Sequence, residues 1–371
     1  MNRARALDLM DPRDARVPHF WQELEARSQP PYFLSWGWIE NWLAALPVDA
    51  TPQLAVVTED GEPEAAFFLG RRRVRRHVVV PSNALYFNAT GSPRHDEVCI
   101  EHNGLLASAG ARRSLGAILD LLPGEWDELF LPAADRYAFD DLGTAASLGS
   151  YRVRIDRESA APFIDLDAVR AVEGGYVSLL GASTRTQLRR TRRIVGNLDV
   201  EIAEDEHQAL DIWGELLRLH ARRWADRGER GAFADPWFER FHRRLITTRL
   251  ASGEIQLVRV RAGTTTIGCL YNFVYRGRVL FYQSGLAAFD DPHIKPGFLC
   301  HAAAVEYNAL AGHQIYDLLG GTSRYKQSLA TGATRLVWLR VQRQRVRFAV
   351  EDQMRKLRDV LATPRLALRS A

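Results

Sequence analysis

Lysine is scarce in this sequence, although basic residues as a whole are not. Of 49 basic residues in a chain of 371, only three are lysines, at positions 295, 326 and 356. The 45 acidic residues leave a formal net charge of +4, whereas a general nucleic-acid binder needs a dense, one-sided basic surface. We therefore expect no nucleic-acid partner. Each lysine that does occur carries more information than a lysine usually does.

Cysteine and long apolar runs are scarce as well. Cys99, Cys269 and Cys300 form no CxxC pair, and no histidines stand near them at metal-ligand spacing. This excludes a disulfide framework and a structural zinc site, and it predicts buried thiols in a reducing compartment. Residues 1–18 lack the apolar core of a signal peptide, and no apolar run approaches the roughly 18–20 residues of a membrane span. We expect a cytoplasmic protein without a membrane span and without a metal ion.

The apolar pattern predicts two similar domains of mixed α/β type. A length of 371 residues suits two or three domains of roughly 100–200 residues each. In the first half the expected order is a helix, a strand hairpin, a second helix and further strands. The segments are a helix at 32–46 with Ser35 as its N-cap, strands at 53–58 and 64–69, a helix at 105–122, and strands at 126–131 and 162–166.

The second half repeats this order with clearer signals. Three strands separated by short turns, at 255–260, 265–275 and 279–286, predict an antiparallel meander. The other segments are helices at 178–195, 206–227, 236–251 with Asp235 as N-cap, 297–311 and 349–361, and strands at 198–202, 314–319 and 338–346.

These elements predict an α/β (α+β) fold class, in which each domain is a mixed, mostly antiparallel sheet flanked by helices. The two domains would join around Glu173 and the two glycines that follow it. The predicted boundaries are a lead-in at 1–29, a first domain at 30–168, a second domain at 169–346 and a helical tail at 347–371.

The loop between the strand at 279–286 and the next helix is a candidate phosphate site. Lys295 and Gly297 stand where the helix begins. A helix start presents backbone N–H groups and the positive end of the helix dipole, both of which suit an anion. Lys295 would add a cation there. The alternative is a plain loop with a helix cap.

Two polar residues on apolar helix faces are candidate proton carriers. Glu306 projects between two apolar rows of the helix at 297–311, where burial raises a carboxyl pKa toward a value useful for proton transfer. The alternative is a glutamate at the helix edge that pairs with an arginine. His220 continues the apolar face of the helix at 206–227. It is either a proton carrier or substrate contact, or a histidine satisfied within the core.

Arginines gather on one face of the helix at 178–195. Arg185, Arg189, Arg192 and Arg193 share that face. Arginine forks suit phosphate and carboxylate groups, so the face is a candidate contact for an anionic ligand. The alternative is a solvated charged face.

Two glycines follow the predicted buried strand at 314–319. Gly320 and Gly321 allow the backbone to approach another group closely. Lys326 stands just beyond them, outside the end of a strand, which is a common ligand position in α/β sheets. The sequence contains no nucleophile elbow and no GxGxxG after a strand.

Several of these segments together resemble a known family. They are residues 33–38, residues 183–193, Leu219-His-Ala-Arg-Arg-Trp-Ala-Asp-Arg-Gly228, Lys295-Pro-Gly297, Gly312, and Tyr316-Asp-Leu-Leu-Gly-Gly-Thr-Ser-Arg-Tyr-Lys326. Their order and spacing resemble the CelD-type acetyltransferases. This GNAT-related family is associated with cellulose and exopolysaccharide biosynthesis and is distantly similar to the FemABX aminoacyltransferases. The resemblance covers roughly residues 30–340.

The resemblance implies tandem GNAT-like domains with an acyl-donor site in the second. The donor would be acyl-CoA or an acyl carrier protein, used as a co-substrate and not bound permanently. Its pantetheine would lie along the strand at 279–286, and its pyrophosphate would meet the following helix start. The donor contacts implied are Tyr282, Ser284, Gly285, Lys295, Gly297 and Phe298.

The resemblance also implies the chemistry. An amine or hydroxyl of a small-molecule or saccharide acceptor would attack the thioester directly in a ternary complex, so catalysis would consist mostly of positioning. Glu306 or His220 would be the base, and Lys326 would contact the donor or the reacting group. The expected substrate contacts are Arg185, Arg189, Trp224, Asp317 and Tyr325.

Two alternatives to this N- or O-acyltransferase remain open from the sequence. One is aminoacyl transfer from charged tRNA, as in the FemABX enzymes, with the arginines at 185–193 serving the RNA. The other is a catalytically degenerate GNAT-like subunit of a polysaccharide synthesis complex, with the arginine-rich end at 335–369 as its docking surface.

Overall fold

The computed structural model describes residues 4–76, 80–98, 100–142, 147–351 and 353. Within these residues, 14 strands belong to one sheet, whose main path runs β1-β2-β3-β4-β6-β14-β8-β13-β12-β11-β10-β9. Two short strands lie off this path, β5 against β3 and β7 against β8. Cys99, one of the three cysteines, lies outside the described residues, while Cys269 and Cys300 are buried as free thiols.

The first half of the chain, up to residue 165, contains six strands of the main path and three α-helices. Its elements are β1 (Arg5–Met10), α1 (Val17–Ala26), η1 (Tyr32–Leu34), α2 (Trp36–Ala45), η2 (Val48–Ala50), β2 (Gln53–Glu59), β3 (Glu62–Arg76), β4 (Val80–Phe87), η3 (His95–Val98), β5 (Leu106–Ala107), α3 (Leu115–Leu121), β6 (Glu128–Asp135), β7 (Ser147–Leu148) and β8 (Tyr151–Asp165).

The second half carries most of the helices. Its elements are α4 (Leu166–Ala171), α5 (Gly175–Leu179), α6 (Ala182–Val195), β9 (Asp199–Ile202), α7 (Glu206–Ala225), η4 (Ala232–Ala234), α8 (Pro236–Arg249), β10 (Ile255–Ala262), β11 (Thr265–Tyr275), β12 (Arg278–Leu286), α9 (Pro296–Leu310), β13 (Ile315–Asp317), α10 (Arg324–Leu329) and β14 (Gly332–Arg343).

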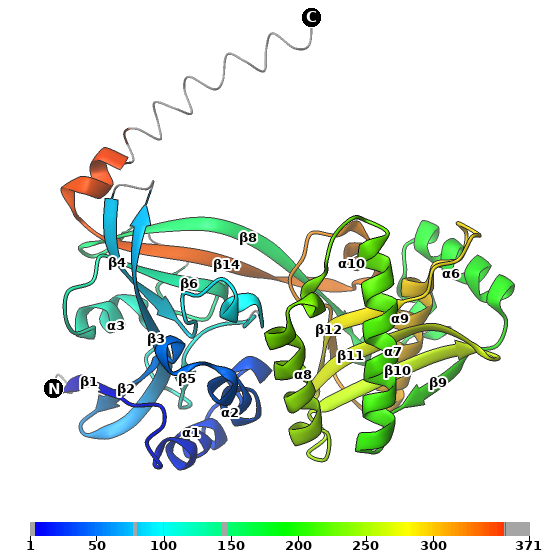
Figure 1. Ribbon diagram of the computed structural model, residues 1–371, viewed down its shortest axis with the longest axis horizontal. Helices are drawn as coiled ribbons and strands as arrows, with labels where there is room; N and C mark the ends of the chain where they lie inside the picture. The colour runs from blue at the N-terminus through cyan, green and yellow to red at the C-terminus, as the bar shows by residue number, and fades with distance from the viewer. Residues whose placement is uncertain (1–3, 77–79, 99, 143–146, 352, 354–371) are drawn as a thin grey trace, which may run out of the picture.

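The two halves repeat one arrangement, which confirms the predicted fold class. Each has a strand, two helices, a three-stranded antiparallel meander, a helix and a further strand. In each half the last meander strand pairs in parallel with that further strand, β4 with β6 and β12 with β13. The sheet is therefore mixed but mostly antiparallel, and helices cover both halves (Figure 1).

The halves are joined by exchanged strands, which the predicted boundary at 168/169 does not reflect. β8 belongs to the first half, yet its end pairs with β13 of the second. β14 comes from the second half, yet it lies between β6 and β8. Figure 1 shows β8 and β14 side by side, passing from one half to the other. The sheet therefore does not divide where the chain passes between domains.

Several predicted elements hold and two are corrected. Ser35 and Asp235 cap α2 and α8 as predicted, each accepting a backbone N–H. The predicted helix at 105–122 is helical only over Leu115–Leu121, because Ser114 caps it there and residues 106–107 pair with β3 instead. The predicted helix at 178–195 begins at Ala182, after a break at Gly181. Most of the predicted tail at 347–371 lies outside the described residues.

A short segment of the first half, residues 100–104, bridges β4 and β6 where they diverge and leaves only a small cavity of about 170 Å³ beside it; we call it the closing segment. The two strands pair only over three residues each, up to Tyr86 and Phe130. Beyond that point the Asn103 amide donates to the carbonyls of Phe87 and Pro132, both at 3.0 Å. Buried backbone carbonyls need such partners. The closing segment therefore supplies what a neighbouring strand would supply.

The residue before Asn103 in the closing segment, His102, enters a charged cluster between the halves. Its Nε2 lies 3.1 Å from Asp317 Oδ2, and its Nδ1 lies 3.6 Å from Asp135 Oδ2. Arg278 Nη2 lies 3.0 Å from the same Asp317 oxygen. Burial opposes the charge on His102, but Asp317 and Asp135 outweigh it and raise its pKa to about 10. Burial likewise opposes the charge of Asp317, yet His102 and Arg278 lower its pKa to about 2.

Replacing Asn103 by alanine should destabilise the fold. It removes both amide donors and the oxygen that accepts from Asn88 Nδ2 at 2.8 Å. We expect a loss in the free energy of unfolding of roughly 1–3 kcal/mol for each buried group left unpaired. Urea denaturation of Asn103→Ala measures it. Asn83→Ala, at an exposed residue of β4, is the control, and equal effects of both changes would contradict the proposed closure.

Stability should depend on pH through His102. Its folded pKa lies above the unfolded value, so its contribution is complete below pH 6.5 and is lost as pH rises through about 10. We expect the unfolding free energy of the wild type to fall between pH 7 and 10, by up to about 1.4 kcal/mol per pH unit. His102→Gln should be less stable at pH 7 and flatter over this range. His19→Gln, at an exposed position, should behave as the wild type, and parallel curves for all three proteins would refute the assignment.

Candidate functional site

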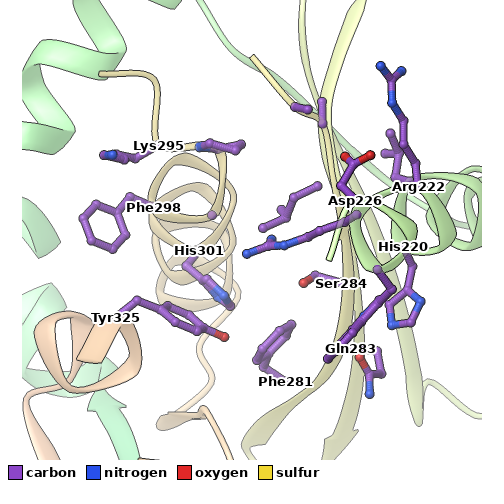
Figure 2. A pocket seen from close by; sticks show the side chains of 18 of the residues that line it. His220, Arg222, Asp226, Phe281, Gln283, Ser284, Lys295, Phe298, His301 and Tyr325 are labelled. Carbon is purple, nitrogen blue, oxygen red and sulfur yellow. The ribbon is translucent and has the colours of Figure 1, made fainter. Parts of the chain in front are cut away.

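In the second half, the gap between the two diverging parallel strands is open, whereas the closing segment bridges the corresponding gap in the first half. β12 and β13 pair only over Arg278–Leu280 and Ile315–Asp317 and then diverge. A cavity of about 660 Å³ opens there, which we call the cleft. Its lining comes from Gln187 of α6, from residues between 219 and 227 at the end of α7 and just beyond it, and from residues 281–284 and 286–288 of β12 and the loop after it. Residues between 295 and 301 around the start of α9, and Tyr325 and Lys326 of α10, complete the lining. In Figure 2, Lys295, Phe298 and His301 lie around α9 on one side of the view, and His220, Arg222 and Asp226 lie on the other.

The wall formed by β12 is an irregular strand edge. Opposite β11 the register shifts, because Tyr271 pairs with Gln283 while Asn272 pairs with Phe281. The extra residue is Tyr282, so β12 bulges at this point. On its other side, the described pairing with β13 stops at Leu280. An exposed strand edge of this kind can pair with an extended chain that contains amide groups.

The hydroxyl of Tyr282 is fixed by a chain of hydrogen bonds. It donates to the Val98 carbonyl at 3.0 Å and lies 3.1 Å from His242 Nε2. His242 Nδ1 lies 3.4 Å from the Tyr271 hydroxyl, and complete burial keeps the His242 pKa well below its usual value. The neutral ring therefore donates through Nε2 and accepts through Nδ1. This chain ties the bulge to α8 and to the first half.

The cleft is strongly basic. Among the described residues that line it, the basic side chains are Arg222, Arg223, Arg227, Lys295 and Lys326, against the single carboxylate of Asp226. Burial and the neighbouring charge of Arg227 lower the pKa of Arg223. Cations crowded in this way are stabilised by an anion, and arginine forks match phosphate oxygens. The cleft is therefore suited to a phosphorylated ligand.

Lys295 lies at one end of the cleft, where α9 begins (Figure 2). The N–H groups of Phe298 and Leu299 both donate to its carbonyl, at 3.0 and 3.2 Å. The start of α9 therefore has fewer backbone N–H groups available to an anion than the predicted phosphate site assumed. Attraction for an anion at this end depends mainly on the Lys295 side chain and on the helix dipole.

A group of rings and one ammonium lies farther along the cleft. His301 stacks on Tyr325 with ring centroids 6.0 Å apart, and its Nδ1 lies 3.3 Å from the Tyr316 hydroxyl. Burial, with Lys326 adding to it, lowers the His301 pKa to about 3, so the ring is neutral. Lys326 Nζ donates to the Gly320 carbonyl at 2.9 Å and lies 6.0 Å from the Phe281 ring centre.

Sequence reasoning missed His301. A signal was present, because this histidine interrupts the small apolar residues of α9 as Glu306 does. His220 was predicted and does line the cleft. It is 4% exposed, packs edge-on against Phe233, and has its pKa lowered to about 4 by burial and by Arg223.

The structure brings most of the predicted site residues together in the cleft. They are His220, Trp224, Tyr282, Ser284, Lys295, Gly297, Phe298, Tyr325 and Lys326. They come from four separate elements, so no sequence spacing could show that they share one cavity.

The other predicted site residues lie outside the lining of the cleft. Glu306 pairs with Arg192 at 2.9 Å on the outer side of α9, as in the alternative prediction for it. Asp317 is buried in the charged cluster with His102. Helical periodicity gives the face on which a residue lies but not the neighbour that covers it, which explains the misplacement of Glu306.

Three further predicted residues do not line the cleft. Arg185 donates to the Leu180 carbonyl, and Arg189 is exposed on α6. Gly285 packs against α7, where a Cβ would lie 2.4 Å from the Leu216 carbonyl oxygen. Gly285 therefore lets α7 approach β12, and its role is in packing.

Two further observations limit the kinds of site present. In the described ranges, no three or more His, Cys, Asp or Glu side chains gather where they could hold a metal ion. No helix in the described part of the chain has the length and apolar character needed to cross a bilayer.

Comparison with known proteins agrees with the location of the cleft. Residues 182–327 match the acetyltransferase (GNAT) domain model. No curated protein matches the chain. The predicted link to cellulose and exopolysaccharide biosynthesis therefore stays a prediction.

Solved structures show the fold alone, since their sequences are distant. A conserved protein of unknown function from Bacteroides thetaiotaomicron has 10% identity and a TM-score of 0.54, covering 88% of this chain and 97% of its own. FemX has 9% identity and a TM-score of 0.53, covering 86% and 95%. L-PGS from Bacillus licheniformis has 11% identity and a TM-score of 0.51, covering 88% and 92%. The GNAT match in the second half thus supports acyl transfer as the general class of activity.

Proposed function

We propose that the protein transfers an acyl group from acyl-CoA, or from an acyl carrier protein, to an amine or hydroxyl of a small molecule or saccharide. One observation carries this proposal, namely the open edge of β12 in a basic cleft. A donor arm that contains amides can pair with that edge, and its phosphates can meet the cations. The matched GNAT domain spans both features.

The two ends of the cleft suit the two ends of such a donor. Lys295 and the arginines of α7 would hold the phosphates. The thioester would lie toward Lys326, whose ammonium stabilises the negative charge that develops on the carbonyl oxygen. Tyr325 would donate its hydroxyl proton toward the departing thiolate, since burial raises its pKa and keeps it protonated.

His220 is the candidate base in the cleft. It would take the proton of the attacking amine or hydroxyl as the new bond to the acyl carbon forms and the carbon–sulfur bond breaks. Burial and Arg223 keep its imidazole neutral at neutral pH, which is the form that accepts a proton. Trp224, one turn further along α7, would contact the acceptor.

Aminoacyl transfer from charged tRNA is the second candidate. It is favoured by the fold shared with FemX and by Gln187 of α6, which places the arginine-rich α6 beside the cleft. The Arg189 and Arg193 side chains would then lie along the RNA backbone. A catalytically degenerate GNAT-like subunit is the remaining alternative and predicts no saturable donor binding.

Calorimetry with acetyl-CoA, longer acyl-CoAs and free CoA tests the proposal. We expect saturable binding that weakens as salt is raised, and Lys295→Glu should weaken it at least about tenfold by replacing attraction with repulsion at the phosphates. Arg73→Glu, exposed on β3 of the first half, is the matched control and should bind as the wild type does. Absence of binding to every thioester would overturn the proposal, and tight binding of charged tRNA alone would favour the second candidate.

The pH dependence of acyl transfer tests His220. Because its pKa is lowered to about 4, the neutral form persists, and this residue should cause no loss of rate between pH 8 and about 5. An ordinary histidine would lose most of its basic form by pH 5.5. His220→Gln should lower kcat by about 10²-fold or more. His313→Gln, at a half-buried histidine outside the cleft, should not, and an acid limb near pH 6.5 would argue against His220.

A further inference from the structure

Lys326 is held by a loop whose own backbone is restrained. The loop comprises residues 318–321, after β13 and before α10. The Lys326 ammonium donates to its Gly320 carbonyl at 2.9 Å and lies 3.5 Å from its Leu319 carbonyl. The position of the ammonium in the cleft therefore depends on where these two carbonyls point.

The loop adopts a backbone conformation that needs support. Leu319 has a φ of +58°, in the left-handed region that residues other than glycine rarely occupy, and Gly321 has a φ of +151°. Such conformations persist only where the surroundings enforce them. Here the Leu319 N–H donates to Asp317 Oδ1 at 2.8 Å, and the Gly321 N–H lies within 3.1 Å of Ser159 Oγ.

A further restraint comes from Glu101, which like Ser159 belongs to the first half. The Gly320 N–H donates to Glu101 Oε2 across the boundary between the halves. A Cβ on Gly320 would lie 3.1 Å from that oxygen, so glycine allows the close approach. Burial raises the Glu101 pKa, while the Gly320 N–H, Lys326 and His102 favour its charged form. Glu101 therefore holds the N–H of Gly320, the same residue whose carbonyl accepts from Lys326.

Glu101 belongs to the closing segment, so the same five residues perform two tasks. Asn103 satisfies the diverging strands of the first half. His102 pairs with Asp317, whose other oxygen holds the Leu319 N–H. Both charged residues of the segment thus reach the loop, Glu101 directly and His102 through Asp317.

We propose that Glu101 is a positioning residue for Lys326 and that it acts through Gly320. The first half, in which the closing segment bridges β4 and β6, thereby sets the geometry of the cleft in the second half. The consequence for acyl transfer rests on the function proposed above. The contact from Glu101 through Gly320 to Lys326 does not, and it can be tested separately.

Lysine-selective ¹³C labelling tests the positioning without any substrate. The chain has only three lysines, so three side-chain signals are expected, and Lys326→Arg identifies the relevant one. Glu101→Gln keeps the size and an oxygen acceptor but removes the charge. We expect it to move the Lys326 signal and leave those of Lys295 and Lys356 in place. An unmoved Lys326 signal in a folded Glu101→Gln protein would overturn the proposal, whether or not the protein is an acyltransferase.

A double-mutant cycle tests the consequence for turnover. Glu101→Ala should lower kcat by about 10–100-fold while the KM for the acyl donor changes little, because the ammonium is misplaced but the phosphate contacts remain. In a Lys326→Ala background the same change should have little further effect. If Glu101→Ala lowered kcat by the same factor in the wild-type and Lys326→Ala backgrounds, its effect would be unrelated to Lys326, and the proposal would be refuted.

The matched control is Glu158→Ala. Glu158 lies on β8 beside Ser159 and pairs with Arg136 and Arg335 at the surface. The Glu158→Ala substitution should alter neither the Lys326 signal nor kcat. A change as large as that caused by Glu101→Ala would show a general disturbance of the boundary between the two halves and would count against the proposal. If the wild type neither binds nor turns over any acyl donor, the proposed function fails, and the lysine signals still decide the role of Glu101.

Discussion

Two parallel strands that pair briefly and then diverge leave backbone N–H and C=O groups facing a gap, and such groups must find partners. Both halves of this protein contain that feature, β4 with β6 and β12 with β13. In the first half Asn103 bridges the gap from within the chain. In the second half the gap is the basic cleft, which is where a ligand can supply the missing partners. The two halves thus meet the same constraint differently: the gap is bridged by the chain itself in the first half and stays open in the second.

The halves depend on each other beyond simple contact. β8 and β14 are exchanged between them, so neither half of the sheet is complete without the other. The buried charges of His102, Asp317 and Arg278 lie at the same boundary, and removing one partner would leave another charge unpaired in a poorly solvated place. The loop whose Gly320 carbonyl accepts from Lys326 is restrained from both sides of this boundary. The geometry of the cleft is therefore a property of the whole chain.

Much of the fold could be predicted from local patterns. The meander of β10, β11 and β12, the caps at Ser35 and Asp235, and the repetition of one element order follow from alternation, turn residues and capping chemistry. The predicted helix at 105–122 failed because apolar composition alone does not distinguish a helix from a short strand followed by a loop. The strand exchange left no local signal at all.

The sequence by itself determined most helices and strands and the repetition of their order in the two halves. It also singled out Lys295, His220 and Lys326, which line one cleft in the structure. These follow from short-range rules of spacing and turn chemistry. Only the tertiary structure decided that Glu306 faces Arg192, that Asp317 is buried with His102, that His301 lines the cleft, and that Glu101 accepts from the Gly320 N–H. Each of these depends on which distant segment covers a given face, and that is set by packing of the whole chain and not by its local pattern.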